Sequence, residues 1–208
     1  MKIIIATGTR GNDIYFRLAE FMAEMVHRYN AEIIFGECSW SAPRAQNLAI
    51  RTILTRQFDY VLFVDADVAP PMDVIDKLVA VQGDIVGAPV WMGYEQDIHL
   101  NVHYRHHPGR VYEGKPGGVE EVEHASFACL LVSEKVFREF QRRDENMLEW
   151  SPMLGPNTGG VPDSYFSHKA RMMGFRIHVC WDAIGSIHHR PMRLGEDMIR
   201  HVLQYCRA

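Results

Sequence analysis

The sequence predicts an α/β fold in which helices flank a mostly parallel central sheet. One observation is the run of aromatic and aliphatic residues at 60–64, which is apolar at every position and does not alternate. A strand that is buried on both faces of a sheet has this pattern. The other observation is that apolar runs and segments of helical period alternate along residues 1–91. Strands that alternate with helices form mostly parallel sheets.

The individual elements follow from this alternation. Short apolar runs predict strands at residues 2–7, 31–36, 60–64, 84–91, 125–132 and 175–179. Apolar residues at helical spacing predict helices at residues 13–27, 44–56, 72–81, 133–143, 162–173 and from about 195 onward. Between them we expect short strands and loops at 93–123, with 100–104 paired to 119–122, and a long loop at 147–161.

Length and composition limit the possible classes of protein. The 208 residues are enough for one well-packed domain, and the net charge of −4 does not indicate a nucleic-acid surface. The four cysteines form no CxxC motif, and the first residues do not resemble a signal peptide, so we expect a reducing cytoplasm. No apolar stretch approaches the roughly 20 residues needed to cross a bilayer, so no transmembrane segment is expected.

The acidic strand end, residues 58–68, is the feature from which we infer function. Asp65 and Asp67 follow the buried run, and the period of two in a strand lets both carboxylates project to the same side. Two such charges about 6 Å apart repel by about 0.7 kcal/mol in water and about 3 kcal/mol at an effective dielectric near 20. A partly buried pair therefore favours a hard divalent cation such as Mg²⁺ or Mn²⁺. The alternative is that both are solvated turn residues before Pro70.

Two other segments could bind an anion. Thr7, Thr9 and Arg10 lie in a strand-to-helix loop that could hold a nucleotide, although it is neither a P-loop nor a dinucleotide fingerprint. An ordinary tight turn is the alternative. Arg44 and Asn47 share one face near the start of a helix, which suits a diphosphate. A solvated arginine with a structural asparagine is the alternative there.

Several motifs occur in a characteristic order along nearly the whole chain. They are Arg44 with Asn47, YVLFVDAD at 60–67, DIVG at 84–87, DSYF at 163–166, KAR at 169–171, GFR at 174–176 and IHH at 187–189. This ordered set resembles the GT-A glycosyltransferases, in particular family-2-like and related short bacterial or phage-type enzymes. The resemblance implies a Rossmann-like GT-A sheet with a small antiparallel and loop region around the site. It also implies one domain over 1–208, with a nucleotide-binding half at 1–92 and a half at 93–208 that holds the acceptor and completes the metal site.

The resemblance further implies transfer of a glycosyl group, of hexosyl type, from a UDP- or GDP-sugar to an unknown acceptor, with Mn²⁺ or Mg²⁺ bound. Asp65, Ala66 and Asp67 match the DxD motif, in which Asp67 would bind the ion. Asp65 would face the ribose or make a direct or water-mediated metal contact. His188 matches a late histidine that completes the metal shell, with His189 as the alternative.

Asp163 matches the general base that takes a proton from the acceptor hydroxyl, although an Asp at a helix start can also be a simple cap. Two positions depart from the family pattern. Pro162 stands where a Glu is common, and the spacing at 44–47 leaves either Arg44 or Gln46 in the place of the family's arginine.

Other interpretations stay open at this point. Trp91, Trp150 and Tyr165 could stack on a sugar on the acceptor side, or they could be core residues. His99, His103, His106 and His107 have no spacing that specifies a zinc site. A nucleotidyltransferase on a related scaffold and a non-catalytic nucleotide-sugar or glycan-binding domain are the alternatives to a glycosyltransferase. The donor base, the stereochemistry and the oligomeric state are not specified.

Overall fold

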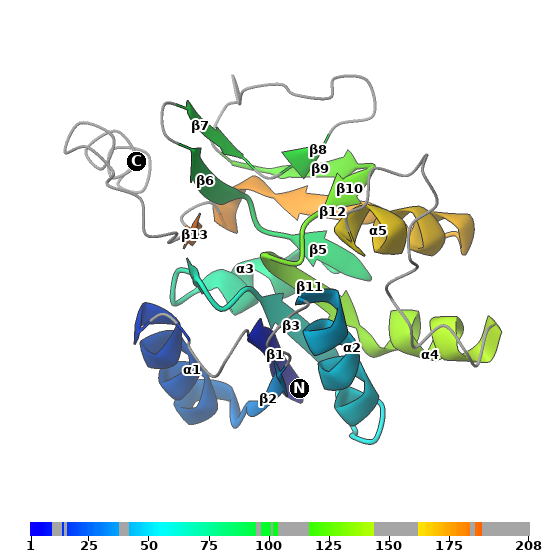
Figure 1. Cartoon of the computed structure of the whole chain (residues 1–208). Coiled ribbons are helices and arrows are strands. Elements are labelled where there is room, and N and C mark those ends of the chain that lie inside the picture. The colour runs from blue at the N-terminus through cyan, green and yellow to red at the C-terminus, as the bar shows by residue number, and fades with distance from the viewer. Residues whose placement is uncertain are drawn as a thin grey trace.

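A computed structural model of the chain describes residues 1–9, 14, 16–37, 42–94, 97–100, 102–103, 117–143, 162–183 and 186–188. Its centre is a seven-stranded sheet in the order β2-β1-β3-β11-β5-β12-β9 (Figure 1). The strands are β1 (Ile3–Thr9), β2 (Glu32–Glu37), β3 (Tyr60–Val64), β5 (Ile85–Gly87), β9 (Val119–Val122), β11 (Cys129–Ser133) and β12 (Ile177–Cys180). The helices are α1 (Phe16–Tyr29), α2 (Ala42–Ile53), α3 (Val74–Ala80), α4 (Glu134–Arg143) and α5 (Pro162–Met172), and a 3-10 turn, η1, spans Trp181–Ala183.

The sheet is mostly parallel. β1 pairs in parallel with β2 and β3, and β5 pairs in parallel with β12. β11 lies between β3 and β5 and is antiparallel to both, while β9 is antiparallel to β12 at the edge. The predicted α/β fold class, with a mostly parallel central sheet flanked by helices, is therefore confirmed.

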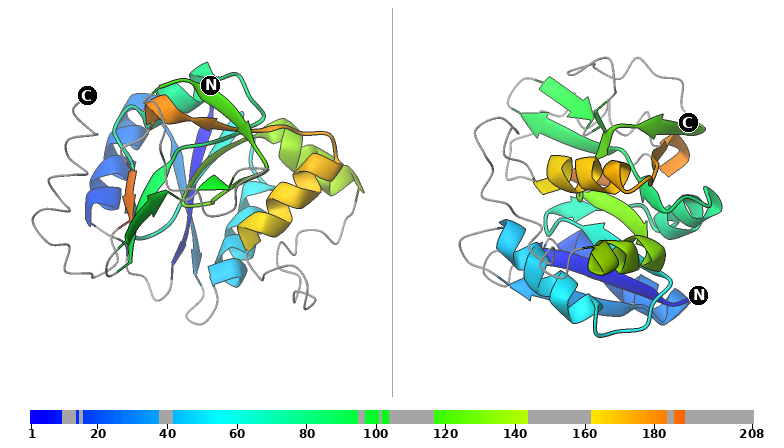
Figure 2. Two further views of the ribbon diagram at one scale, coloured as in Figure 1. Left: turned by 90° about the horizontal axis from the view of Figure 1, so that it is seen from above. Right: turned by 90° about the vertical axis from the view of Figure 1, so that its right-hand side faces the viewer.

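Helices cover both faces of this sheet. Figure 2 shows α1 and α3 on one side and α2, α4 and α5 on the other. The residues of β3 alternate between the two cores, since Leu62 and Val64 pack with α1 and α3 while Val61 and Phe63 pack with the other helices. Burial on both faces explains why the run at 60–64 has no polar position. None of the helices in the described segments is both long and apolar enough to span a bilayer.

Short strands form two smaller sheets. The first has the order β4-β13-β6-β7, from β4 (Val68–Ala69), β13 (Ser186–His188), β6 (Val90–Tyr94) and β7 (Asp97–Leu100). The second pairs β8 (Val102–His103) with β10 (His124–Ala125). The expected small antiparallel region is therefore present, because β4 is antiparallel to β13 and β6 is antiparallel to β7.

Three sequence predictions were wrong in detail. The strand expected at 125–132 is interrupted at Ser126–Ala128, where the Ser126 hydroxyl accepts the Ala128 N–H at 3.2 Å and stabilises a turn. The strand expected at 84–91 is two strands in different sheets, β5 and β6, because Pro89 between them has no N–H for a ladder. Among the described residues of 100–104, none pairs with 119–122; β9 instead pairs with β12, and β8 with β10.

The helix expected at 44–56 is α2, at Ala42–Ile53, and the helix expected at 72–81 is α3, at Val74–Ala80. Shifts of this size are expected at helix ends, because side-chain periodicity defines the ends of a helix less well than its middle. The expected loop at 147–161 and the expected helix from about 195 lie outside the described residues.

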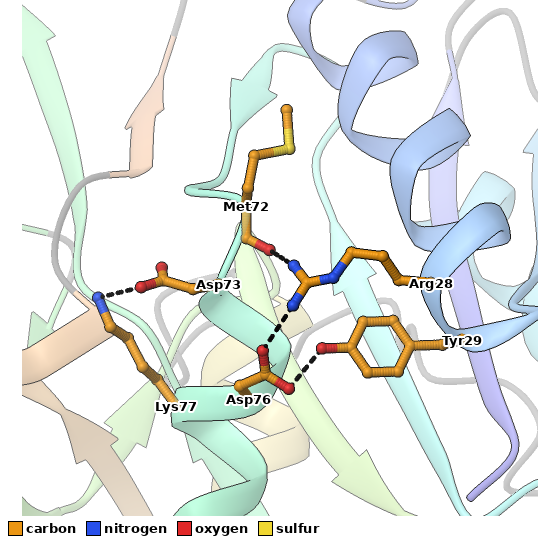
Figure 3. A network of polar contacts seen from close by, with 6 residues as sticks. All are labelled: Arg28, Tyr29, Met72, Asp73, Asp76 and Lys77. Atoms are coloured by element: carbon orange, nitrogen blue, oxygen red, sulfur yellow. Dashed lines mark hydrogen bonds and ion pairs between the residues drawn. The ribbon is translucent and has the colours of Figure 1, made fainter.

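A polar network joins the end of α1 to the start of α3 (Figure 3). The Arg28 guanidinium donates to the Met72 carbonyl at 2.7 Å and to the Asp76 carboxylate at 3.0 Å. The Tyr29 hydroxyl donates to the same carboxylate. Burial, and then the hydrogen bond to Asp76, raise the pKa of Tyr29 from its ordinary value of 10.0 to about 12. The network thereby fixes the chain shortly after the acidic strand end.

The raised pKa predicts how stability depends on alkaline pH. Because the folded-state pKa of Tyr29 lies above the ordinary value, its protonated phenol favours the folded state fully below about pH 10, and this contribution is lost as pH rises toward about 12. In urea titrations, the wild type should therefore lose free energy of unfolding relative to Tyr29→Phe across that window. Parallel curves for the two proteins would contradict the network in Figure 3.

Candidate functional site

The acidic strand end lies at the carboxyl end of β3. Asp65 and Asp67 occupy the turn between β3 and β4, and the Val68 N–H closes it by donating to the Asp65 carbonyl at 3.0 Å. Both acidic side chains are partly exposed, whereas Val64 and Val68 on either side are buried. Ligand sites of parallel α/β sheets lie outside the carboxyl ends of the strands. The two carboxylates are therefore at the edge where chemistry is expected.

Asp163 reaches this edge from α5. Its Oδ2 accepts hydrogen bonds from the Ser126 hydroxyl at 2.7 Å and from the Phe127 N–H at 3.3 Å. The next residue, Ala128, accepts the Asp65 N–H on its carbonyl at 3.3 Å. The turn at Ser126–Ala128 therefore connects the carboxylate of Asp163 to the backbone of the acidic strand end.

Buried aromatic rings in the core pack against the turn at Ser126–Ala128 and against α5. The Phe127 ring contacts Phe63 of β3 at a centroid distance of 4.9 Å and Phe166 of α5 at 5.2 Å. Phe166 also stacks on Phe140 of α4 at 5.5 Å. These rings are buried, and edge-to-face and offset pairs of this kind add to the stabilisation from burial. The strand end, the turn and α5 therefore share one apolar support.

The backbone of β13 approaches from the other side. His188 lies opposite Val68 in the antiparallel pair of β13 with β4, so its backbone is beside the residue that follows Asp67. Ile187, the preceding residue, lies opposite Trp91 of β6. The register thus brings the positions of Asp67, His188 and Trp91 into one small sheet region. The side chains of His188 and Trp91 lie outside the described part of the structure.

Thr7 lies near the end of β1, next to β3. Its side chain is 1% exposed, and its Oγ1 has no hydrogen-bond partner within the described part of the chain. The two preceding residues pair with Leu62 and Phe63 of β3, so Thr7 approaches the same carboxyl edge. A buried hydroxyl without a partner destabilises the fold unless a ligand or another group satisfies it.

Other expected site residues are placed only in part. The backbones of Thr9 and Arg44 belong to β1 and α2, but their side chains are not described, and neither are those of Gln46 and Asn47. Arg10, Trp150 and His189 lie outside the described residues altogether.

Tyr165 does not join the same side of α5 as Asp163. It is two residues further along the helix, so its side chain is rotated by about 200° from that of Asp163. The Lys169 ammonium lies 5.6 Å from the centroid of the Tyr165 ring. The side chains of Tyr165 and Asp163 therefore point to different sides of α5.

The donor set at the strand end fits a hard cation. Asp65 and Asp67 offer carboxylate oxygens, which Mg²⁺ and Mn²⁺ prefer. Among the described side chains, no group of three or more His, Cys, Asp or Glu residues could by itself hold a metal ion. A third protein ligand would have to come from a side chain beyond them, and His188 and His189 are the expected ones.

Two buried serines were missed in the sequence. Ser126 is 8% exposed and Ser167 of α5 is 1% exposed, and the Ser167 hydroxyl accepts the Ala125 N–H at 3.4 Å. For Ser126, the signal was a serine inside the apolar run at 125–132, which we interpreted as part of a strand. A hydroxyl in such a run needs a partner, and both partners come from elements distant in sequence.

A groove of about 560 Å³ lies at the opposite edge of the sheet, before β5 and β12. Its basic side chains are balanced by carboxylates, as Lys135 pairs with Asp84 at 2.9 Å and Arg142 with Glu139 at 2.7 Å. Because the groove is at the amino ends of these strands and its charges are compensated, it is not part of the candidate site.

Comparisons with known proteins identify the fold but no family. No family model matches the chain, and no curated protein matches it. Among solved structures, A197 from STIV is similar at 13% sequence identity with a TM-score of 0.61, over 91% of this chain and 86% of that chain. A structure of S. aureus TarS 1-349 in complex with UDP matches at 12% identity with a TM-score of 0.48, over 99% of this chain and 64% of that chain. The similarity to A197 shows that the two chains share a fold.

The hydroxyl of Thr7 gives a stability prediction. Thr7→Val replaces it with a methyl group of similar size and should raise the free energy of unfolding of the ligand-free protein by about 1 kcal/mol. Thr7→Ser keeps the hydroxyl, removes a buried methyl and should lower the same quantity by about 1 kcal/mol. Urea denaturation measures both. A destabilised Thr7→Val variant would mean that the hydroxyl has a partner in the folded protein.

Proposed function

We propose that this chain is a metal-dependent glycosyltransferase that moves a sugar from a nucleoside-diphosphate sugar to an acceptor. The observation that supports it best is the meeting of three distant segments at one edge of the sheet. The acidic strand end, the start of α5 with Asp163, and β13 with His188 are joined there by the turn at Ser126–Ala128 and by the pairing of β4 with β13. An enzyme of this class needs a metal site, a nucleotide site and a base within reach of one another.

In this proposal, Asp67 binds Mn²⁺ or Mg²⁺, with Asp65 as a further ligand or as the contact to the ribose. His188 or His189 completes the ligand set. When bound, the ion stabilises the negative charge that develops on the diphosphate leaving group. Arg44, Thr7, Thr9 and Arg10 would contact the donor, a UDP- or GDP-sugar. Residues 1–92 then hold the nucleotide, and residues 93–208 supply the acceptor side and the remaining ligand.

Asp163 acts as the general base. Its carboxylate takes the proton from the acceptor hydroxyl as that oxygen attacks the sugar. Ser126 and Phe127 donate to one oxygen of this carboxylate, and hydrogen bonds from neutral donors stabilise the ionised form that a base requires. The partial exposure of Asp163 is compatible with access by an acceptor.

The proposal is tested by ligand binding and then by turnover. Thermal shift against a panel of nucleoside diphosphates should show stabilisation by UDP or GDP, and only with Mn²⁺ or Mg²⁺, because a ligand that binds the folded state stabilises it by mass action. The corresponding nucleotide-sugar should then be hydrolysed or transferred. Turnover of nucleoside triphosphates with release of pyrophosphate would indicate a nucleotidyltransferase, and binding without any turnover would indicate a binding domain.

Asp67→Asn tests the proposed metal ligand. It keeps the size of the side chain but removes its charge, so metal-dependent turnover should fall by at least about 100-fold, since ion stabilisation supplies several kcal/mol. Asp73→Asn is the matched control, because Asp73 is an exposed acid directly before α3 whose surface ion pair with Lys77 contributes little to stability. Full turnover of Asp67→Asn at saturating Mn²⁺ would show that the proposed site is wrong.

Asp163→Asn tests the proposed base. The amide oxygen can still accept from Ser126 and Phe127, so the fold should persist, while kcat should fall by about 10²–10⁴-fold because the amide takes up no proton. Steady-state kinetics and circular dichroism measure the two effects. If turnover were kept, Asp163 would have only the structural role of joining α5 to the turn.

A further inference from the structure

The segment 125–128 presents three hydrogen-bond donors to α5. The Ser126 hydroxyl and the Phe127 N–H donate to Oδ2 of Asp163, at 2.7 and 3.3 Å. The Ala125 N–H donates to the Ser167 hydroxyl at 3.4 Å. Because Asp163 and Ser167 are four residues apart, they lie on the same face of the helix. Two side chains of α5, one turn apart, therefore bind one short segment before β11.

Ser126 and Ser167 make different hydrogen bonds between this segment and α5. Its hydroxyl accepts the Ala128 N–H at 3.2 Å and donates to Asp163. A serine hydroxyl has one proton, and the N–H occupies part of its acceptor side, so the proton is directed to the carboxylate. Hydrogen bonds to a carboxylate are shorter and stronger than neutral ones, and the 2.7 Å contact is the shortest in this segment. The Ser167 hydroxyl, by contrast, binds only a backbone N–H among the described residues.

The Ser126 hydroxyl also links Asp163 to the backbone of the acidic strand end. Ala128, whose N–H is held by Ser126, accepts the Asp65 N–H on its carbonyl. The hydrogen bonds thus run from the Asp163 carboxylate through Ser126 and Ala128 to Asp65. A general base must lie within hydrogen-bond reach of its substrate proton, and a displacement of about 1 Å can cost about 100-fold in rate.

We infer that Ser126 is a positioning residue, which aims the carboxylate of Asp163 at the acceptor by holding it against the turn at Ser126–Ala128. This inference rests on the proposed function, in which Asp163 is the base. Ser126 touches neither the donor nor the metal in this account. Its removal should therefore slow the chemical step and leave binding of the donor and of Mn²⁺ unchanged.

The experiment compares Ser126→Ala with Ser167→Ala in the full chain. Both remove a buried hydroxyl from the same interface, and both leave one backbone N–H without its partner. Ser126→Ala should lower kcat by about tenfold or more with the donor KM within about twofold, because the base is misplaced. Ser167→Ala should change kcat by less than about threefold. Ser126→Thr, which keeps the hydroxyl, should restore most of the rate.

Mn²⁺ binding, followed by electron paramagnetic resonance, gives a second readout. Ser126→Ala should bind Mn²⁺ as the wild type does, whereas Asp67→Asn should not. If Ser126→Ala does not fold, Ser126→Cys takes its place, since a thiol is a weaker donor. Equal losses of kcat in the two serine variants, or no loss at position 126, would overturn the inference while Asp67→Asn and Asp163→Asn remain inactive. Unchanged turnover in those two Asn variants would instead overturn the proposed function, and this inference with it.

Discussion

The antiparallel position of β11 between β3 and β5 is the constraint on which the candidate site depends. Because β11 runs against β3, its first residue, Cys129, lies opposite Val64, the last residue of β3. The turn that precedes β11 is thereby held at the carboxyl edge, next to the acidic strand end. If β11 were parallel to β3, the same turn would lie at the amino edge of the sheet. One reversed strand therefore decides that α5, which binds this turn, is connected through it to the acidic strand end.

The polar connection at this edge is supported by the core beneath it. The rings of Phe63, Phe127 and Phe166 form a continuous contact from β3 through the turn to α5. These buried rings exclude water from one side of the hydrogen bonds between Asp163 and the turn, and a less polar environment strengthens such bonds. Packing and hydrogen bonding thus hold β3, the turn and α5 together, although these elements are distant in the sequence.

The sequence was sufficient to predict those features that a local residue pattern determines. Burial on both faces identified β3, and the rule for parallel strands placed Asp65 and Asp67 at the carboxyl edge of the sheet, where the structure has them. The direction of β11 could not be predicted, because a buried apolar run has the same residue pattern whether the strand is parallel or antiparallel to its neighbours. The role of Ser126 could not be predicted for a related reason. Its hydroxyl binds Asp163, which is 37 positions away in the chain, and no local pattern indicates that hydrogen bond. The pairing of β4 with β13 involves strands of two and three residues, too short for any period.

In the proposed function, these segments form one metal and nucleotide site at the carboxyl edge of the sheet. A crystal structure with Mn²⁺ and a nucleoside diphosphate tests it most directly, through the anomalous scattering of manganese. We predict a manganese peak at the Asp67 carboxylate, with the diphosphate bound to the ion and the carboxylate of Asp163 facing the same space. Manganese bound elsewhere, or a nucleotide in the groove before β5 and β12, would contradict it.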